Sequence, residues 1–133
     1  MQINRQPACS AEPGDVTTGN VKPLLHEIRH ALRRWLDHQE STTIDLRSIP
    51  MAPGEEDEIA EELGTGEIFV QMSALGPSEI VETRYPGVWR VTHYNSNREV
   101  IGKFIEVCDL PRLLKAADED ISDGLEQLEA QLV

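Results

Sequence analysis

The stretch VWRVTHYNSNREVIGKFIEV, residues 88–107, decides the fold. Two runs rich in β-branched and aromatic residues, 88–94 and 99–107, flank the sequence Asn95-Ser96-Asn97. Asn and Ser favour tight turns because their side chains hydrogen-bond to nearby backbone groups. A connection this short joins antiparallel neighbours, so the stretch predicts a β-hairpin.

Three further strands are predicted before this hairpin. Alternation of apolar and polar residues indicates strands at 42–49, 67–73 and 79–84. Strands that follow one another along a chain favour a mainly antiparallel sheet, with helices gathered on it. We therefore expect four or five strands in one sheet.

Helical spacing of apolar residues predicts helices at 22–38, at 55–63 and from Pro111 onward. The last of these keeps a long apolar stripe: Leu113, Leu114, Ala117, Ile121, Leu125, Leu128 and Leu132. The fold class is α+β, with about three helices packed on the sheet. Four residues are expected in the core: Leu32, Trp35, Ile105 and Val107.

The length of 133 residues fits a single domain, which we place at 20–133. Residues 1–19 lack an apolar segment and contain Pro and Gly, so they are expected to form a disordered tail and not a secretory signal. No apolar run approaches the roughly 18 residues of a membrane span. Cys9 and Cys108 are too few for a disulfide framework, which favours a reducing, cytoplasmic location.

The formal net charge is -12, and it is unevenly distributed. Residues 54–83 carry nine acids and no Lys or Arg, and residues 116–133 carry six acids and again no base. Such a surface repels nucleic acid and anionic lipid, so both are set aside as partners. Either the acids form a solvated face or they attract a basic segment of another protein.

The sequence His26-Glu27-Ile28-Arg29-His30 has the H-E-x-x-H spacing of a zinc site. On a helix the two histidines stand about 40° apart, whereas the apolar stripe centres about 220° away from His26. We therefore expect both histidines to face solvent without a metal. The alternative is a zinc-dependent hydrolase in which Glu27 serves as general base.

Two rigid turns are candidates for partner binding. The sequences 75–79 and 85–89 are rich in Gly and Pro, and the second places Tyr85 and Trp89 on either side of a turn. Alternatively, Trp89 fills the core and Tyr85 covers it. The predicted surface combines these aromatic and apolar residues with acids: Tyr85, Trp89, Leu75, Glu79 and Glu82.

No motif for a nucleotide or another cofactor is present, and no nucleophile stands out. Cys108 ends an apolar run, which is typical of a small buried residue. His93 shares a strand face with Trp89, so it is interpreted as packed or hydrogen-bonded. The chain therefore fits a binding protein better than an enzyme.

Five stretches, in this order and spacing, resemble the C-terminal conserved region of the HupH/HyaF hydrogenase expression proteins: 25–32, 43–50, 75–79, 85–89 and 102–107. The resemblance implies a cytoplasmic accessory protein, or chaperone, for the maturation of uptake NiFe hydrogenases. It implies binding to the iron–sulfur small subunit before export, or to other hydrogenase maturation proteins. It brings no catalytic residues, and homo-oligomerisation stays open.

Overall fold

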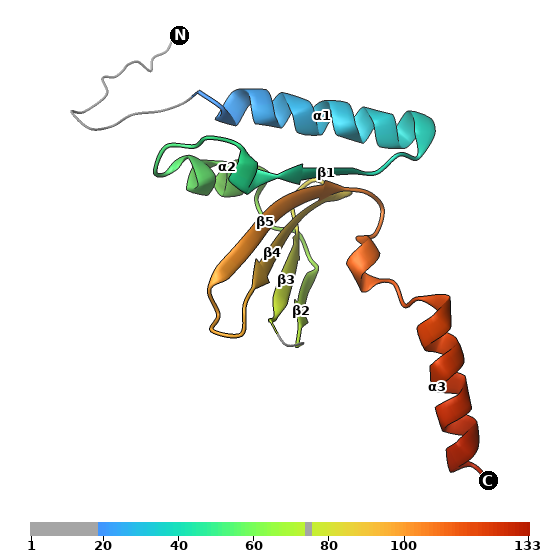
Figure 1. Ribbon diagram of the computed structural model, residues 1–133. Coiled ribbons are helices and arrows are strands. Elements are labelled where there is room, and N and C mark those ends of the chain that lie inside the picture. The colour runs from blue at the N-terminus through green and yellow to red at the C-terminus, as the bar shows by residue number, and fades with distance from the viewer. Residues whose placement is uncertain (1–18, 74–75) are drawn as a thin grey trace.

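The computed structural model describes residues 19–73 and 76–133, so the predicted tail lies almost entirely outside the described residues. Helices and strands follow in the order shown in Figure 1: α1 (Val21–His38), β1 (Thr42–Asp45), η2 (Leu46–Ser48), α2 (Glu55–Leu63), β2 (Phe69–Met72), β3 (Ser78–Glu82), β4 (Val88–Tyr94), β5 (Val100–Val107), η3 (Arg112–Leu114) and α3 (Asp118–Gln131).

The five strands form one antiparallel sheet in the order β1-β5-β4-β3-β2. Strands β2 to β5 follow one another as neighbours, and β1 joins the sheet beside β5. The predicted α+β class and its mainly antiparallel sheet are confirmed. Among the described residues, none of the helices has the length and hydropathy that a bilayer crossing needs.

Strands β4 and β5 form the predicted antiparallel hairpin, and β4 is the central strand of the sheet. The backbone N–H of Asn95 donates to Glu99 O at 2.9 Å, and the side-chain oxygen of Asn95 accepts from the N–H groups of Asn97 and Glu99. Arg98 takes a positive φ of 64°, which a short reversal of the chain requires. Asn95 therefore organises the turn through its own side chain.

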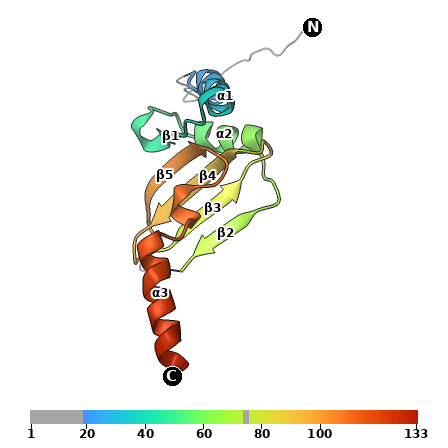
Figure 2. The ribbon, with the colours of Figure 1, turned by 90° about the vertical axis from the view of Figure 1, so that its right-hand side faces the viewer.

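Helices α1 and α2 lie over one end of the sheet, with α1 outermost (Figures 1 and 2). Their apolar faces meet β1, η2, β4 and β5 in the main core. Ile105 and Val107 are fully buried there, as predicted, whereas Leu32 is only half-buried at its edge. Ten buried residues make this core: Leu24, Ile28, Ala31, Ile44, Leu46, Ile59, Leu63, Val88, Ile105 and Val107.

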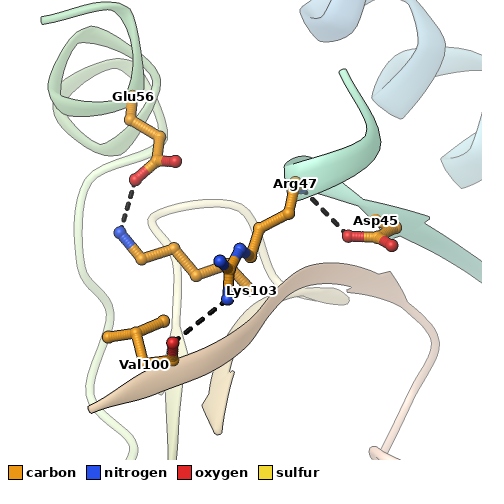
Figure 3. Close-up of polar contacts among 5 residues, drawn as sticks. All are labelled: Asp45, Arg47, Glu56, Val100 and Lys103. Atoms are coloured by element: carbon orange, nitrogen blue, oxygen red, sulfur yellow. Dashed lines mark hydrogen bonds and ion pairs between the residues drawn. The ribbon is translucent and has the colours of Figure 1, made fainter. Parts of the chain in front are cut away.

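Polar contacts tie α2 and η2 to β5 (Figure 3). Lys103 on β5 pairs with Glu56 on α2. Arg47 donates from Nη1 to Val100 O at 3.1 Å, and its backbone N–H donates to Asp45 Oδ1 at 2.9 Å. The first two of these contacts join α2 and η2 to β5.

A second buried cluster contains Ile80, Trp89, Val91 and Cys108. Trp89 and Val91 of this cluster alternate along β4 with Val88 of the main core, because successive side chains of a strand point to opposite faces. Trp35, predicted to be buried, is half-buried against this cluster. The two faces of β4 therefore serve two different clusters.

Two predicted elements differ from the structure. The strand expected at 42–49 stops at Asp45, because the Asp45 carboxylate accepts the Arg47 N–H and starts the 3₁₀ turn of η2. The final helix begins at Asp118 instead of Pro111, and no residue of α3 is buried. Figures 1 and 2 show α3 extending away from the sheet and from α1.

Candidate partner-binding site

The β3–β4 turn is held rigidly at the helical end of the sheet. Thr83 is buried, its backbone N–H donates to Val88 O at 3.0 Å, and its hydroxyl lies 3.2 Å from both Tyr85 N and Tyr85 O. Arg84 N–H donates to Leu63 O at 2.8 Å, which anchors the turn to the end of α2. Gly87 closes the turn with a φ of 94°.

Tyr85 protrudes from this turn with 44% of its surface exposed. It borders a groove of about 280 Å³ between α1 and α2. The groove is apolar except for one cation and one anion, and six side chains line it beside Tyr85: Leu25, Ile28, Arg29, Leu32, Glu62 and Leu63. The arrangement suits an apolar side chain with a charged neighbour.

A second hollow of about 410 Å³ is adjacent to this groove, and Leu25 and Glu62 line both. Lys22 and two further acids of α2, Glu55 and Glu58, also line it. Glu55 is buried and accepts the backbone N–H groups of Gly19 and Ala52. The exposed acids along this hollow are therefore Glu58 and Glu62. We call the two hollows together the α1–α2 groove.

Trp89 does not belong to the surface predicted for it. It is 3% exposed, and its indole N–H donates to Cys108 O at 3.1 Å. Because Trp89 lies within β4, its side chain points to the second buried cluster. The alternative interpretation, in which Trp89 fills the core, is the one that the structure supports.

The two predicted turns lie at opposite ends of β3. Gly76 approaches Tyr94, since a Cβ added at Gly76 would lie 2.8 Å from Tyr94 O. A five-residue strand separates this end from Tyr85 by about 16 Å. Leu75 lies outside the described residues. A single surface built from both turns, as predicted, is therefore not formed.

Glu79 and Glu82 each have an internal partner. The Tyr94 hydroxyl donates to Glu79 Oε1 at 3.1 Å, and this hydrogen bond raises the pKa of Tyr94. At the other end of β3, Glu82 Oε1 accepts the backbone N–H of Glu67 at 3.0 Å. Of the predicted acids, only Glu82 lies at the same end of the sheet as Tyr85.

His26 and His30 are exposed on α1, as the helical geometry predicts. Arg29 Nη2 lies 3.3 Å from His30 Nε2, which places a cation beside one of the two supposed ligands. In the part of the chain that the structure describes, no three His, Cys, Asp or Glu residues gather as metal ligands do. Among the described residues, no third side chain is therefore placed to bind zinc together with His26 and His30.

One polar pair was not foreseen from the sequence. Ser78 Oγ and His93 Nδ1 lie 2.7 Å apart across β3 and β4, where the two residues are paired in register. The His93 ring also stacks edge-on against Phe104, with centroids 5.7 Å apart. His93 is thus both packed and hydrogen-bonded, in agreement with its interpretation from the sequence.

Cys108 is buried as a free thiol. Burial, followed by the neighbouring carboxylates of Glu106 and Asp109, raises the pKa of the Cys108 thiol to about 11. Burial also raises the pKa of Glu106. A thiol of this kind stays protonated at neutral pH, which suits packing and not nucleophilic attack.

Comparisons with known proteins place the fold and the sequence in one family. Residues 18–133 match the family described as "HupH hydrogenase expression protein, C-terminal conserved region". A solved structure of the hydrogenase expression protein HupH from Thiobacillus denitrificans ATCC 25259 is 37% identical, with a TM-score of 0.84. That match covers 88% of this chain and 98% of the solved chain.

Relatives found by sequence similarity indicate the same family. The chain is 34% identical to the hydrogenase expression/formation protein HupQ of Azotobacter chroococcum mcd 1, over 82% of this chain and 39% of that protein. It is 31% identical to the hydrogenase expression/formation protein HupH of Rhizobium leguminosarum bv. viciae, over 88% of this chain and 44% of that protein. The chain thus spans less than half the length of these relatives. It belongs to the HupH hydrogenase expression protein family, through the C-terminal conserved region of that family.

Proposed function

We propose that this chain is a non-catalytic binding module that assists the maturation of an uptake NiFe hydrogenase. In this proposal it acts in the cytoplasm and binds the iron–sulfur small subunit before export. The names of its relatives, which are hydrogenase expression/formation proteins, support a role in hydrogenase formation. The small subunit is the partner that the resemblance of the five stretches implies.

The observation that carries the proposal is the α1–α2 groove beside Tyr85. Its floor is apolar, and the rigid turn beneath Tyr85 lowers the entropy lost on binding. Glu58 and Glu62 stand exposed along its acidic side. A partner segment that carries an apolar side chain next to Arg or Lys would fill the floor and pair with these carboxylates.

The test is the affinity of the purified chain for the small-subunit precursor, measured by titration calorimetry. Tyr85→Ala should weaken binding about 10-fold, the size expected for an exposed aromatic anchor. Glu62→Gln should weaken binding about 3-fold, and higher salt should reduce the difference. Glu61→Gln is the matched control, because Glu61 neighbours Glu62 on α2 but does not line the groove.

Thermal unfolding of each variant should match the wild type, since Tyr85 and Glu62 are exposed. If the precursor binds Tyr85→Ala and Glu62→Gln as tightly as it binds Glu61→Gln, the groove is not the site. If the precursor does not bind the wild-type chain at all, the proposed partner is wrong.

A further inference from the structure

Helix α3 carries an apolar stripe that nothing in the described structure covers. Ile121, Leu125, Leu128 and Leu132 are between 56% and 77% exposed. Their spacing of four, three and four residues is that of a coiled-coil seam. At about 100° per residue the four side chains fall within about 60° of one another. Over two heptads, this stripe has the form of a helix-binding seam.

The charges on α3 are all of one sign. The helix carries six acids and no Lys or Arg. At the same helical angles, Asp118 and Glu129 lie about 60° and 80° from Ile121, so they flank the stripe on one side. Glu119 and Asp123 lie about 160° and 200° away, on the far side of the helix. One edge of the stripe is therefore acidic.

A second copy of α3 does not suit this stripe. Two such helices side by side would bring the acidic edges of two copies to one seam, and α3 has no Lys or Arg to pair with them. The basic helix α1 offers no matching stripe, because its apolar residues Leu24, Ile28 and Ala31 are buried in its own core. Helix α2 has four acids in its first turn and would repel α3. Charge complementarity to the acidic edge of α3 therefore favours a basic helix from another protein.

Helix α3 also needs support from outside. A 14-residue helix that buries none of its side chains is marginal in water. Acids in its first turn favour the helix dipole, but its last turn has no base and contains Glu129. Cations placed along the acidic edge would remove this unfavourable charge and stabilise the helix.

We propose that the apolar stripe of α3 is a docking site for a basic amphipathic helix of a partner protein, whose apolar side chains cover the stripe while its Lys or Arg residues pair with Asp118 and Glu129. This surface is separate from the α1–α2 groove, and the inference holds whether or not the small subunit is the ligand of that groove.

The probe is a synthetic peptide of about three heptads, with leucine at the a and d positions and lysine on its polar face. Its affinity for the full chain is measured by fluorescence anisotropy, with a scrambled peptide of the same composition as reference. Leu125→Gln/Leu128→Gln should weaken binding at least ~10-fold. Asp118→Asn/Glu129→Gln should weaken it about 3- to 10-fold.

The far-side variant Glu119→Gln/Asp123→Asn removes the same two charges and should change the affinity less than about 2-fold. Tyr85→Ala should leave peptide binding unchanged. The inference is overturned if the peptide and its scrambled form bind alike, if both charge variants weaken binding equally, or if Tyr85→Ala abolishes it. It is also overturned if sedimentation shows dimers that Leu125→Gln/Leu128→Gln dissociates, since the occupant would then be a second copy.

Discussion

Helices α1 and α3 are both amphipathic, yet only α1 uses its apolar face within the fold. Leu24, Ile28 and Ala31 of α1 are buried against α2 and the sheet, whereas every described residue of α3 is exposed. The two helices share the same periodicity in sequence. Their difference shows that an apolar stripe establishes that a helix has a face to cover, but not what covers it.

The largest effect should come from shortening a side chain in the apolar stripe of α1, compared with the same kind of change in the stripe of α3. Ile28→Ala on α1 should cost about 2–5 kcal/mol of unfolding free energy, because Ile28 is 4% exposed in the main core. Leu125→Ala on α3 should stay within ~0.5 kcal/mol. Urea denaturation measures both. Equal losses of unfolding free energy at the two positions would show that α3 packs against other residues in solution. The contrast between α1 and α3 would then be wrong.

The same comparison applies to two aromatic residues, Trp89 within β4 and Tyr85 in the turn before it. Trp89→Phe should cost about 1–3 kcal/mol, because the Cys108 carbonyl loses its indole donor in a buried place. Tyr85→Phe, at an exposed ring, should cost less than ~0.5 kcal/mol. A Trp89→Phe variant as stable as Tyr85→Phe would place Trp89 outside the core.

The reactivity of the Cys108 thiol measures the burial of the cluster that also contains Trp89. In a Cys9→Ser background, maleimide should modify Cys108 at pH 8 at least ~10-fold more slowly in the folded chain than in urea. Burial raises the pKa of this thiol to about 11, so deprotonation favours the unfolded state. The unfolding free energy should therefore fall as the pH rises through the thiol's ordinary range toward 11. Equal modification rates in folded and unfolded chains would contradict the burial.

The smallest effect is expected at the exposed histidines of α1. His26→Ala should change the unfolding free energy by less than ~0.5 kcal/mol, because the side chain is exposed. Metal analysis of the purified chain should find no stoichiometric zinc. Stoichiometric zinc that His26→Ala removes would support the zinc-dependent hydrolase instead.

Local sequence patterns are sufficient to predict most of the helices and strands. The Asn95 turn predicts the β4–β5 pairing, and the apolar spacing of 55–63 predicts α2 with the bounds observed. These features depend on neighbours in sequence, which periodicity and turn residues describe. The placement of β1 beside β5 depends on contacts between distant residues, such as Ile44 with Ile105, and no local pattern encodes it.

The candidate site was less predictable than the fold. The sequence groups Tyr85 with Glu79, which lies at the far end of β3, and with Leu75, which lies outside the described residues. In an antiparallel meander successive turns alternate between the two ends of the sheet, so the predicted strands already separated the 75–79 turn from Tyr85. The groove beside Tyr85 is formed by α1 and α2, whose meeting is a tertiary contact.

Amide hydrogen exchange of the free chain tests most directly the claim that α1 is committed to the core and that α3 is available to a partner. The account predicts strong protection of α1 amides, near the global stability, and weak protection of α3 amides, because α3 makes no buried contact. Addition of the basic amphipathic peptide should then protect α3 and leave α1 unchanged. Equal protection of α1 and α3 in the free chain would contradict the account.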